Sequence, residues 1–464
     1  MTHLVLLLAY SVAQIALGLW IGRRVRDSGD FFVAGRRLRA GLLFATVLAA
    51  NIGAGSTVGA AGLGYRDGLS AWWWVGSAGI GSIVLAVWVG PRIRRLAAEH
   101  DLRTVGDFLE WRYGSSVRAV IAILLWLGTL AILAGQLIAL AWVLNVVAGI
   151  PKYAGCLIGG VVMTTYFTAG GLLASASVNL VQLVVLLLGF ALALPLTMGA
   201  VGGLDAVAAA VADESFWNIW RGGRSGWIYL AMLGPAFVVS PGLLQKVYGA
   251  RDDRAVRIGV GANAVVLLLF AFAPTLLGMA ARVLHPGLSN HELALPTLLM
   301  ADLPPLIGSL GLAALFSAEV SSADAILFML ATSLSQDLYH RFVNPGASDR
   351  QVLAVARGAA VGGGAVGVAL AIVSPTVIGA LSIFYTLLGV SLFVPVIVGL
   401  YSRRPGVAEA LAAIAAGVVI VVALQLWTDG RGSGALTPAL VGIAGAAIAF
   451  AIVGAVRRRG HFSR

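Results

Sequence analysis

The chain has 464 residues, of which 59% are hydrophobic and only 11% are charged. Soluble proteins carry about 25% charged residues, so a chain of several soluble domains would lack the polar surface that it needs. The long apolar runs also exclude a transmembrane barrel, whose strands show short alternating segments. The sequence therefore predicts an all-α polytopic membrane protein. A single cysteine excludes an internal disulfide.

Uncharged runs along the chain predict the membrane-spanning helices, each of which needs about 20 apolar residues. We expect about thirteen spans, at residues 3–21, 40–65, 68–91, 119–151, two within 153–204, 226–245, 258–281, 306–335, two within 358–402, 411–428 and 435–456. The run 153–204 is too long for one helix, and we expect the sequence Thr-Ala-Gly-Gly at 168–171 to divide it into a hairpin.

The net charge of +11 would suggest nucleic acid as a partner in a soluble protein. Here the basic residues lie in short loops, which indicates a role in membrane topology instead. With the N-terminus outside and the C-terminus inside, 25 of the 31 Lys and Arg residues fall on the inner side and six on the outer side. Because inner loops carry the excess of Lys and Arg, this is the predicted orientation.

Two of the expected spans contain residues that interrupt a helix. The second span reads Asn51-Ile52-Gly53-Ala54-Gly55 near its centre, and the seventh contains Gly234-Pro235 and Ser240-Pro241-Gly242. Irregular backbone at membrane depth is tolerated only where it lines a cavity. Interrupted helices in corresponding positions of two halves are typical of transporters with inverted repeats. We therefore expect five-helix halves at 40–204 and 226–402, an extra helix at 1–22, and two helices with a basic tail at 403–464.

The ninth span carries polar side chains at membrane depth. Glu319 and Asp324 are functional candidates, because an intramembrane carboxylate is unfavourable by about 2.5–3.5 kcal/mol. Ala318, Ser321 and Ser322 share one helix face at spacings i, i+3 and i+4. Neutral oxygens from the serines and from a broken neighbouring helix would suit a monovalent cation. The alternative is that both serines bond to carbonyls of their own helix.

Several motifs together resemble the sodium:solute symporter family, of the sodium/glucose, proline and pantothenate cotransporter type. The resemblance extends from about residue 11 to residue 401 and rests on the segments at 30–36, 50–65, 104–114, 170–182, 318–324 and 337–339. It implies a LeuT-like fold with an inverted five-helix repeat. It also implies secondary active transport across the cell (plasma or inner) membrane, without enzymatic activity.

The resemblance implies specific site residues. Sodium would be held by the carbonyls of Ala49, Ile52 and Ala318 and by the hydroxyls of Ser321 and Ser322. The solute would lie between the two broken helices, and its candidate contacts are Asn51, Gly53, Ser56, Trp74, Gln136, Phe237 and Tyr385.

This chain departs from the family pattern at a few positions. Many relatives have Asp where this chain has Asn179, which favours transport of one sodium ion. Glu319 is unusual beside the ion-binding helix, and with Asp324 and Asn179 it is a candidate for ion relay. Ser56 and Val75 stand where the sugar-carrying branch has Gln and Glu, which weakens a sugar assignment.

These observations leave two functions in competition. The first is sodium-driven uptake of a small organic solute by alternating access, with sodium as the coupling ion, no cofactor and a monomer as the functional unit. The second is a proton-coupled symporter that uses Glu319 or Asp324. An enzyme would need clustered acids or a nucleophile–base pair, and the nearest candidate, Asp252-Asp253, is typical of a solvated turn. Amino acids, monocarboxylates and vitamins all remain open as solutes.

Overall fold

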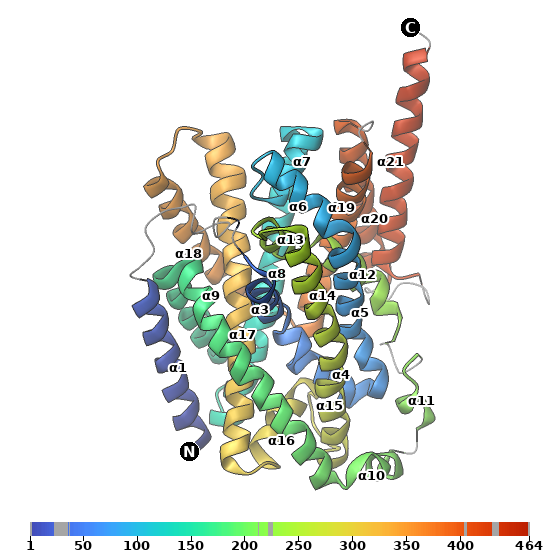
Figure 1. The fold of residues 1–464 in the computed structure, drawn as a ribbon. Coiled ribbons are helices and arrows are strands. Elements are labelled where there is room, and N and C mark those ends of the chain that lie inside the picture. The colour runs from blue at the N-terminus through green and yellow to red at the C-terminus, as the bar shows by residue number, and fades with distance from the viewer. Residues whose placement is uncertain are drawn as a thin grey trace.

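The computed structural model describes residues 2–22, 36, 38–211, 213–220, 226–402, 406–428 and 436–462. Over these residues the chain forms helices joined by short connections, without any named β-strand (Figure 1). The principal helices of the first part are α1 (Thr2–Gly22), α3 (Ala40–Asn51), α4 (Val58–Asp67), α5 (Trp72–Val84), α6 (Gly90–Glu99), α7 (Val105–Tyr113), α8 (Ser115–Ala148), α9 (Lys152–Val201) and α10 (Gly203–Ala210).

The second part of the chain continues in the same all-helical manner. Its principal helices are α12 (Ile228–Val239), α13 (Pro241–Tyr248), α14 (Asp253–Phe270), α15 (Phe272–Leu284), α16 (Ala294–Ala301), α17 (Pro305–Thr332), the π-helix η6 (Ser333–Val343), α18 (Asp349–Val373), α19 (Val377–Tyr401), α20 (Val407–Thr428) and α21 (Pro438–Phe462). The first residues of α1 and the last residues of α21 lie at opposite ends of the molecule (Figure 1).

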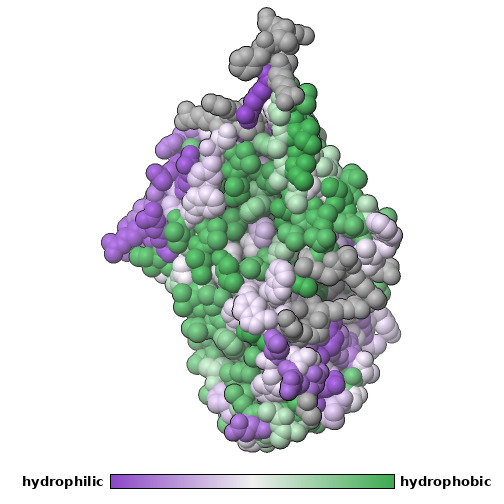
Figure 2. All heavy atoms as spheres, turned by 90° about the vertical axis from the view of Figure 1, so that its right-hand side faces the viewer, coloured by the Kyte–Doolittle hydropathy of each residue, from purple (hydrophilic) through white to green (hydrophobic). Residues whose placement is uncertain are grey.

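Ten helical stretches of the described residues are long and apolar enough to cross a membrane. Hydrophobic residues dominate the middle of the face drawn in Figure 2, and hydrophilic residues gather toward both ends. This distribution matches a bilayer whose hydrocarbon core is about 30 Å thick. The molecule is therefore a multi-pass helical membrane protein, as its composition predicts. The count of about thirteen spans stays a prediction, because the apolar helical segments His3–Gln14 of α1 and Ala40–Asn51 (α3) are shorter than the ten candidates.

Both interrupted helices predicted from the sequence are present. The first ends at Asn51 and resumes at Val58, with a short 3₁₀ turn between. The second is interrupted at Ser240, where α12 ends and α13 begins. Pro235 does not break α12, in contrast to the expectation for Gly234-Pro235, since the helix continues through it. A proline inside a membrane helix is tolerated where neighbouring groups satisfy the freed carbonyl.

Helical secondary structure continues through residues 168–171, since α9 extends from Lys152 to Val201. Gly and Thr lower helix propensity only modestly, and no proline stands at this point to remove a backbone donor. Both ends of α9 nevertheless lie on the same side of the molecule, because Lys152 donates to the Ser374 carbonyl and Val201 packs with Met279 near the end of α15. A straight helix of this length would be about 75 Å long, so the chain reverses direction within α9, as the expected hairpin requires.

The two ends of α9 contact different helices. Gly155 lies against Ala141 of α8, and Gly189 lies against Ala314 of α17.

The contacts between helices follow a reciprocal pattern. Helix α3 packs on α14 while α12 packs on α5, so the broken helix of each half contacts the second helix of the other half. Likewise α8 packs on α19 while α17 packs on α9. The backbones of α4 and α15 approach so closely that a Cβ on Gly278 would lie 2.0 Å from the carbonyl oxygen of Ala61. Small residues permit such close packing of membrane helices.

Candidate functional site

The break between α3 and α4 places backbone carbonyls beside two serines of α17. The last four carbonyls of a helix have no partner within that helix. Here the Ser321 hydroxyl lies 3.1 Å from the Ala49 carbonyl oxygen and 3.2 Å from that of Ala318, and the Ser322 hydroxyl lies 3.1 Å from the Ile52 carbonyl oxygen. The five atoms expected to hold sodium therefore lie together. Both serines reach across to the broken helix, so bonding within α17 alone does not describe them.

Gly53 brings the broken helix into direct contact with this group of oxygens. A Cβ at this position would lie 2.3 Å from the Ser322 Oγ and 2.8 Å from the Gln136 Oε1. The Gln136 Oε1 in turn accepts a hydrogen bond of 2.9 Å from the backbone N–H of Ala54. Glycine at position 53 and the Gln136 amide of α8 thus fix the irregular backbone against α17.

Asn51 and Ser56 hold the other side of the break. The Asn51 amide donates to the Asn263 Oδ1 on α14 at 3.1 Å, and the Ser56 hydroxyl donates to the Asn51 carbonyl at 2.8 Å. Both side chains therefore stabilise the unwound segment while they border the cavity described next.

A cavity lies between the two broken helices. It is lined by the α3–α4 and α12–α13 breaks together with residues of α5, α8, α17 and α19. Ser322 is part of this lining. So are all seven residues expected to contact the solute: Asn51, Gly53, Ser56, Trp74, Gln136, Phe237 and Tyr385.

Aromatic rings form much of this lining. The ring of Tyr385 lies 5.5 Å from that of Phe237 and 6.2 Å from that of Trp74, centroid to centroid. Trp74 also meets Tyr229 edge to face at 5.0 Å. Such rings offer an apolar surface to a solute, and aromatic walls with a few polar groups are typical of small-molecule sites.

Two carboxylates of α17 lie buried beside the serines. Glu319 accepts a hydrogen bond of 3.0 Å from the Thr57 hydroxyl, while its other oxygen, Oε2, has no hydrogen-bond partner among the described residues. Asp324 is also buried, and so is Asn179 on α9. None of these three residues lines the cavity between the broken helices.

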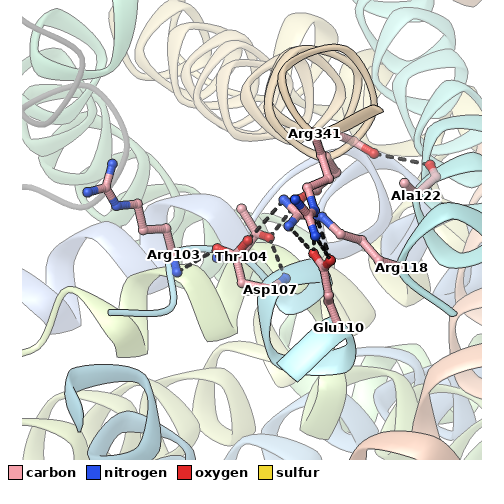
Figure 3. A network of polar contacts seen from close by, with 9 residues as sticks. Arg103, Thr104, Asp107, Glu110, Arg118, Ala122 and Arg341 are labelled. Carbon is pink, nitrogen blue, oxygen red and sulfur yellow. Dashed lines mark hydrogen bonds and ion pairs between the residues drawn. The ribbon is translucent and has the colours of Figure 1, made fainter. Parts of the chain in front are cut away.

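A second polar group of residues lies where α7, α8 and η6 meet, at the same end as the C-terminus (Figures 1 and 3). Arg118 pairs with Asp107 at 2.9 Å, Glu110 at 2.7 Å and Asp337 at 2.7 Å. The Thr104 hydroxyl donates to the same Asp337 oxygen at 2.8 Å. These five residues, named the Arg118 network below, tie Asp337 in the middle of η6 to α7 and α8.

Sequence reasoning overlooked the position of Lys246. The expected span at residues 226–245 ends just before Lys246 and leaves it in an inner loop, whereas it lies on α13 and lines the cavity between the broken helices. The signal was available, since Lys246 follows the Pro241-Gly242 start of α13 by about one helical turn. The role of Asn263 as the partner of Asn51 was also missed, because it depends on the packing of α14 against α3.

Comparison with known proteins agrees with this architecture. The model of the sodium:solute symporter family matches residues 31–417. The sodium/pantothenate symporter of Escherichia coli is 28% identical over 72% of this chain and 71% of its own length. The high-affinity proline transporter PutP of Bacillus subtilis is 24% identical over 90% of each chain.

Solved structures show the same fold. The substrate-bound, outward-open structure of a Na⁺-coupled sialic acid symporter matches with a TM-score of 0.83 at 18% identity, over 98% of both chains. Mhp1, a nucleobase-cation-symport-1 family transporter in a closed conformation, matches with a TM-score of 0.61 at 13% identity over 92% of this chain and 94% of its own. The family match over most of the chain, together with these transporters, shows that this chain is a membrane transporter and not an enzyme, and that it belongs to the sodium:solute symporter family.

Proposed function

We propose that this protein couples inward sodium flow to the uptake of a small organic solute by alternating access. The observation that carries the proposal is the group of oxygens from Ala49, Ile52, Ala318, Ser321 and Ser322, which joins the α3–α4 break to α17. Unwound backbone carbonyls of broken helices coordinate Na⁺ in secondary transporters. A bound ion would hold the broken helix against α17 and so favour one conformation of the transporter.

The solute would occupy the neighbouring cavity between the broken helices. Ser322 borders both the proposed ion site and this cavity, so ion and solute would share a wall of the protein. Each ligand would then stabilise the conformation that the other binds, which is the thermodynamic basis of coupling. The amide at Asn179 supports a stoichiometry of one sodium ion, and a monomer would be the transporting unit.

Sodium binding to purified protein tests this proposal without knowledge of the solute. NaCl replaces KCl at constant ionic strength, and the unfolding temperature is followed as sodium rises. Ser322→Ala should weaken the apparent sodium affinity about 10–100-fold, since a hydrogen-bonding group facing a charge contributes about 1.5–3 kcal/mol. Ser317→Ala is the matched control, because its buried hydroxyl on the same helix donates to the Ala313 carbonyl. Equal sodium affinity in the wild type and Ser322→Ala would reject the site.

Proton coupling is the second candidate function, and one contact favours it. The Thr57 hydroxyl lies 2.9 Å from the Gly53 carbonyl and 3.0 Å from Glu319, yet it has a single proton to donate. A protonated Glu319 could donate to the Thr57 oxygen and satisfy both contacts. Uptake that follows a pH gradient, persists without sodium and is lost in Glu319→Gln would establish this function in place of sodium coupling.

A further inference from the structure

Among the described residues, Lys246 is the only charged one that lines the cavity between the broken helices. Its side chain is partly exposed, and it forms no hydrogen bond or ion pair with any residue in the described part of the chain. Most of the chain's arginines with described side chains do find a partner, as Arg118 does with three carboxylates. Inside a membrane protein an ionisable residue normally faces a partner or a functional cavity. A protonated Lys246 would therefore be stabilised by a negative charge on whatever enters this cavity.

The start of α13 presents further positive potential to the same cavity. Gly242, Leu243 and Lys246 all line it, and Gly242 and Lys246 lie one turn apart on one face of the helix. The first N–H groups of a helix have no partner within the helix and carry partial positive charge. A Cβ at Gly242 would lie 2.9 Å from the Met329 Sδ, so glycine at this position lets the Met329 side chain pack closely against the start of α13.

Within the described part of the chain, no Asp or Glu lines the cavity to balance this charge, and Glu319 and Asp324 lie elsewhere on α17. A sodium ion at Ser322, on the wall of the same cavity, would add a second positive charge. Charges interact strongly at the low effective dielectric of such a site. A cationic solute would therefore be repelled, whereas an anionic solute would neutralise the cavity.

We propose, resting on the function proposed above, that the solute carries a carboxylate and that Lys246 binds this group at the α13 end of the cavity. The aromatic rings of Trp74, Phe237 and Tyr385 would then contact the apolar body of the solute. Lys246 is thus a residue that determines specificity, by selecting carboxylic acids over their neutral analogues.

Matched pairs of acids and amides test the proposal directly. Purified wild-type protein in saturating NaCl is titrated with nicotinate and nicotinamide, phenylacetate and phenylacetamide, and pyruvate and pyruvamide, and the unfolding temperature is measured. At least one acid should stabilise the protein while its amide of nearly equal shape does not. The proposal would be overturned if any amide stabilised the protein as strongly as its acid does. It would also be overturned if none of the three acids stabilised the protein.

Variants then locate the effect at Lys246. Lys246→Gln should raise the apparent Kd of the stabilising acid at least tenfold, and Lys246→Arg should retain binding because it keeps the charge. Unchanged acid affinity in Lys246→Gln would exclude Lys246 as the anchor. The sodium titration without solute separates the two proposals: if sodium still stabilises the protein while amides bind as well as acids, only the carboxylate inference fails. The wild-type selectivity stands as a test even if Lys246→Gln does not fold.

Discussion

Gly53 lies where the broken helix touches the proposed ion site, and its missing side chain leaves room for Ser322. Gly53→Ala would place a Cβ 2.3 Å from the Ser322 Oγ and 2.6 Å from its Cβ. Because these atoms belong to the α17 wall, the serine and the backbone must move apart. We expect sodium-induced thermal stabilisation to be lost. Gly41→Ala, on α3 with no atom within 4 Å of the new Cβ, should keep it. An intact sodium response in Gly53→Ala would contradict this geometry.

Glu292 provides a prediction for pH at the residue scale. It lies between α15 and α16, outside the candidate spans. Its carboxylate accepts hydrogen bonds from the Trp142 Nε1 at 3.0 Å and from the backbone N–H of Val377 at 2.6 Å. Burial raises the pKa of Glu292 from 4.5 to about 7, against the lowering effect of these hydrogen bonds.

The raised pKa fixes the sign of the pH effect. The folded protein holds this proton more tightly than the unfolded chain, so its contribution to stability is fully present below about pH 4.5 and is lost as pH rises through 7. The difference amounts to roughly 3 kcal/mol at 1.36 kcal/mol per pKa unit. We expect the unfolding temperature of the wild type, relative to Glu292→Gln, to fall between pH 5 and pH 8. A constant difference across this range would show that Glu292 does not titrate there.

At the scale of helices, the Arg118 network holds three elements together at one end of the molecule (Figure 3). Removal of the guanidinium in Arg118→Gln leaves Asp337 buried, with Thr104 as its one remaining hydrogen-bond partner among the described residues. Loss of one partner from a buried ion pair destabilises a protein by about 3–5 kcal/mol. We expect the free energy of unfolding to fall by this order, as measured by denaturant or thermal unfolding in detergent.

An exposed ion pair provides the control for this prediction. Arg251 pairs with Asp252 at 2.9 Å, and their side chains are 60% and 41% exposed. Such surface pairs contribute about 0–1 kcal/mol, so Arg251→Gln should be nearly neutral. If both variants lowered the free energy of unfolding by similar amounts, the buried Arg118 network would contribute no more to stability than an exposed ion pair does.

The helices also show which features local sequence could predict. Asn51, Gly53 and Pro241 disrupt helical geometry themselves, so the interruptions at these residues were predicted correctly, whereas the one expected at Gly234-Pro235 was wrong. The serines of α17 were predicted for a similar reason, since spacing alone puts them on one face. The continuation of helical secondary structure through residues 168–171 was not predicted, because glycines only weaken a helix and tertiary packing decides the outcome.

Contacts that depend on the packing of helices distant in sequence could not be predicted from local sequence patterns. Lys246 faces the cavity because α13 begins at Pro241, and a shift of two residues in that start would turn it away. Asn263 meets Asn51 only because α14 crosses α3. The cavity contacts expected from the family resemblance nevertheless all line the cavity. Asn51, Gly53 and Ser56 lie at the break itself, whereas Trp74, Gln136, Phe237 and Tyr385 come from other helices and were expected from the resemblance alone.

At the scale of the whole molecule, the distribution of basic residues predicts orientation. The positive-inside rule places the N-terminus outside and the C-terminus inside. In agreement with opposite sides, the first residues of α1 and the last residues of α21 lie at opposite ends of the fold (Figure 1). Helix α17 crosses once between Gly287, in the connection after α15, and Gly346, in the connection after η6. These two glycines should therefore lie on opposite sides of the membrane, with Gly287 outside.

The single, buried Cys156 makes this orientation directly testable. Gly287 and Gly346 are exposed, and a Cβ on either one meets no atom closer than 3.8 Å, so cysteine fits at both positions. In a Cys156→Ala background, Gly287→Cys should react with a membrane-impermeant maleimide added to intact cells. Gly346→Cys should react only after permeabilisation, and the cysteine-free parent should stay unlabelled throughout. Labelling in the reverse order would invert the orientation, and labelling of both in intact cells would contradict a single crossing by α17.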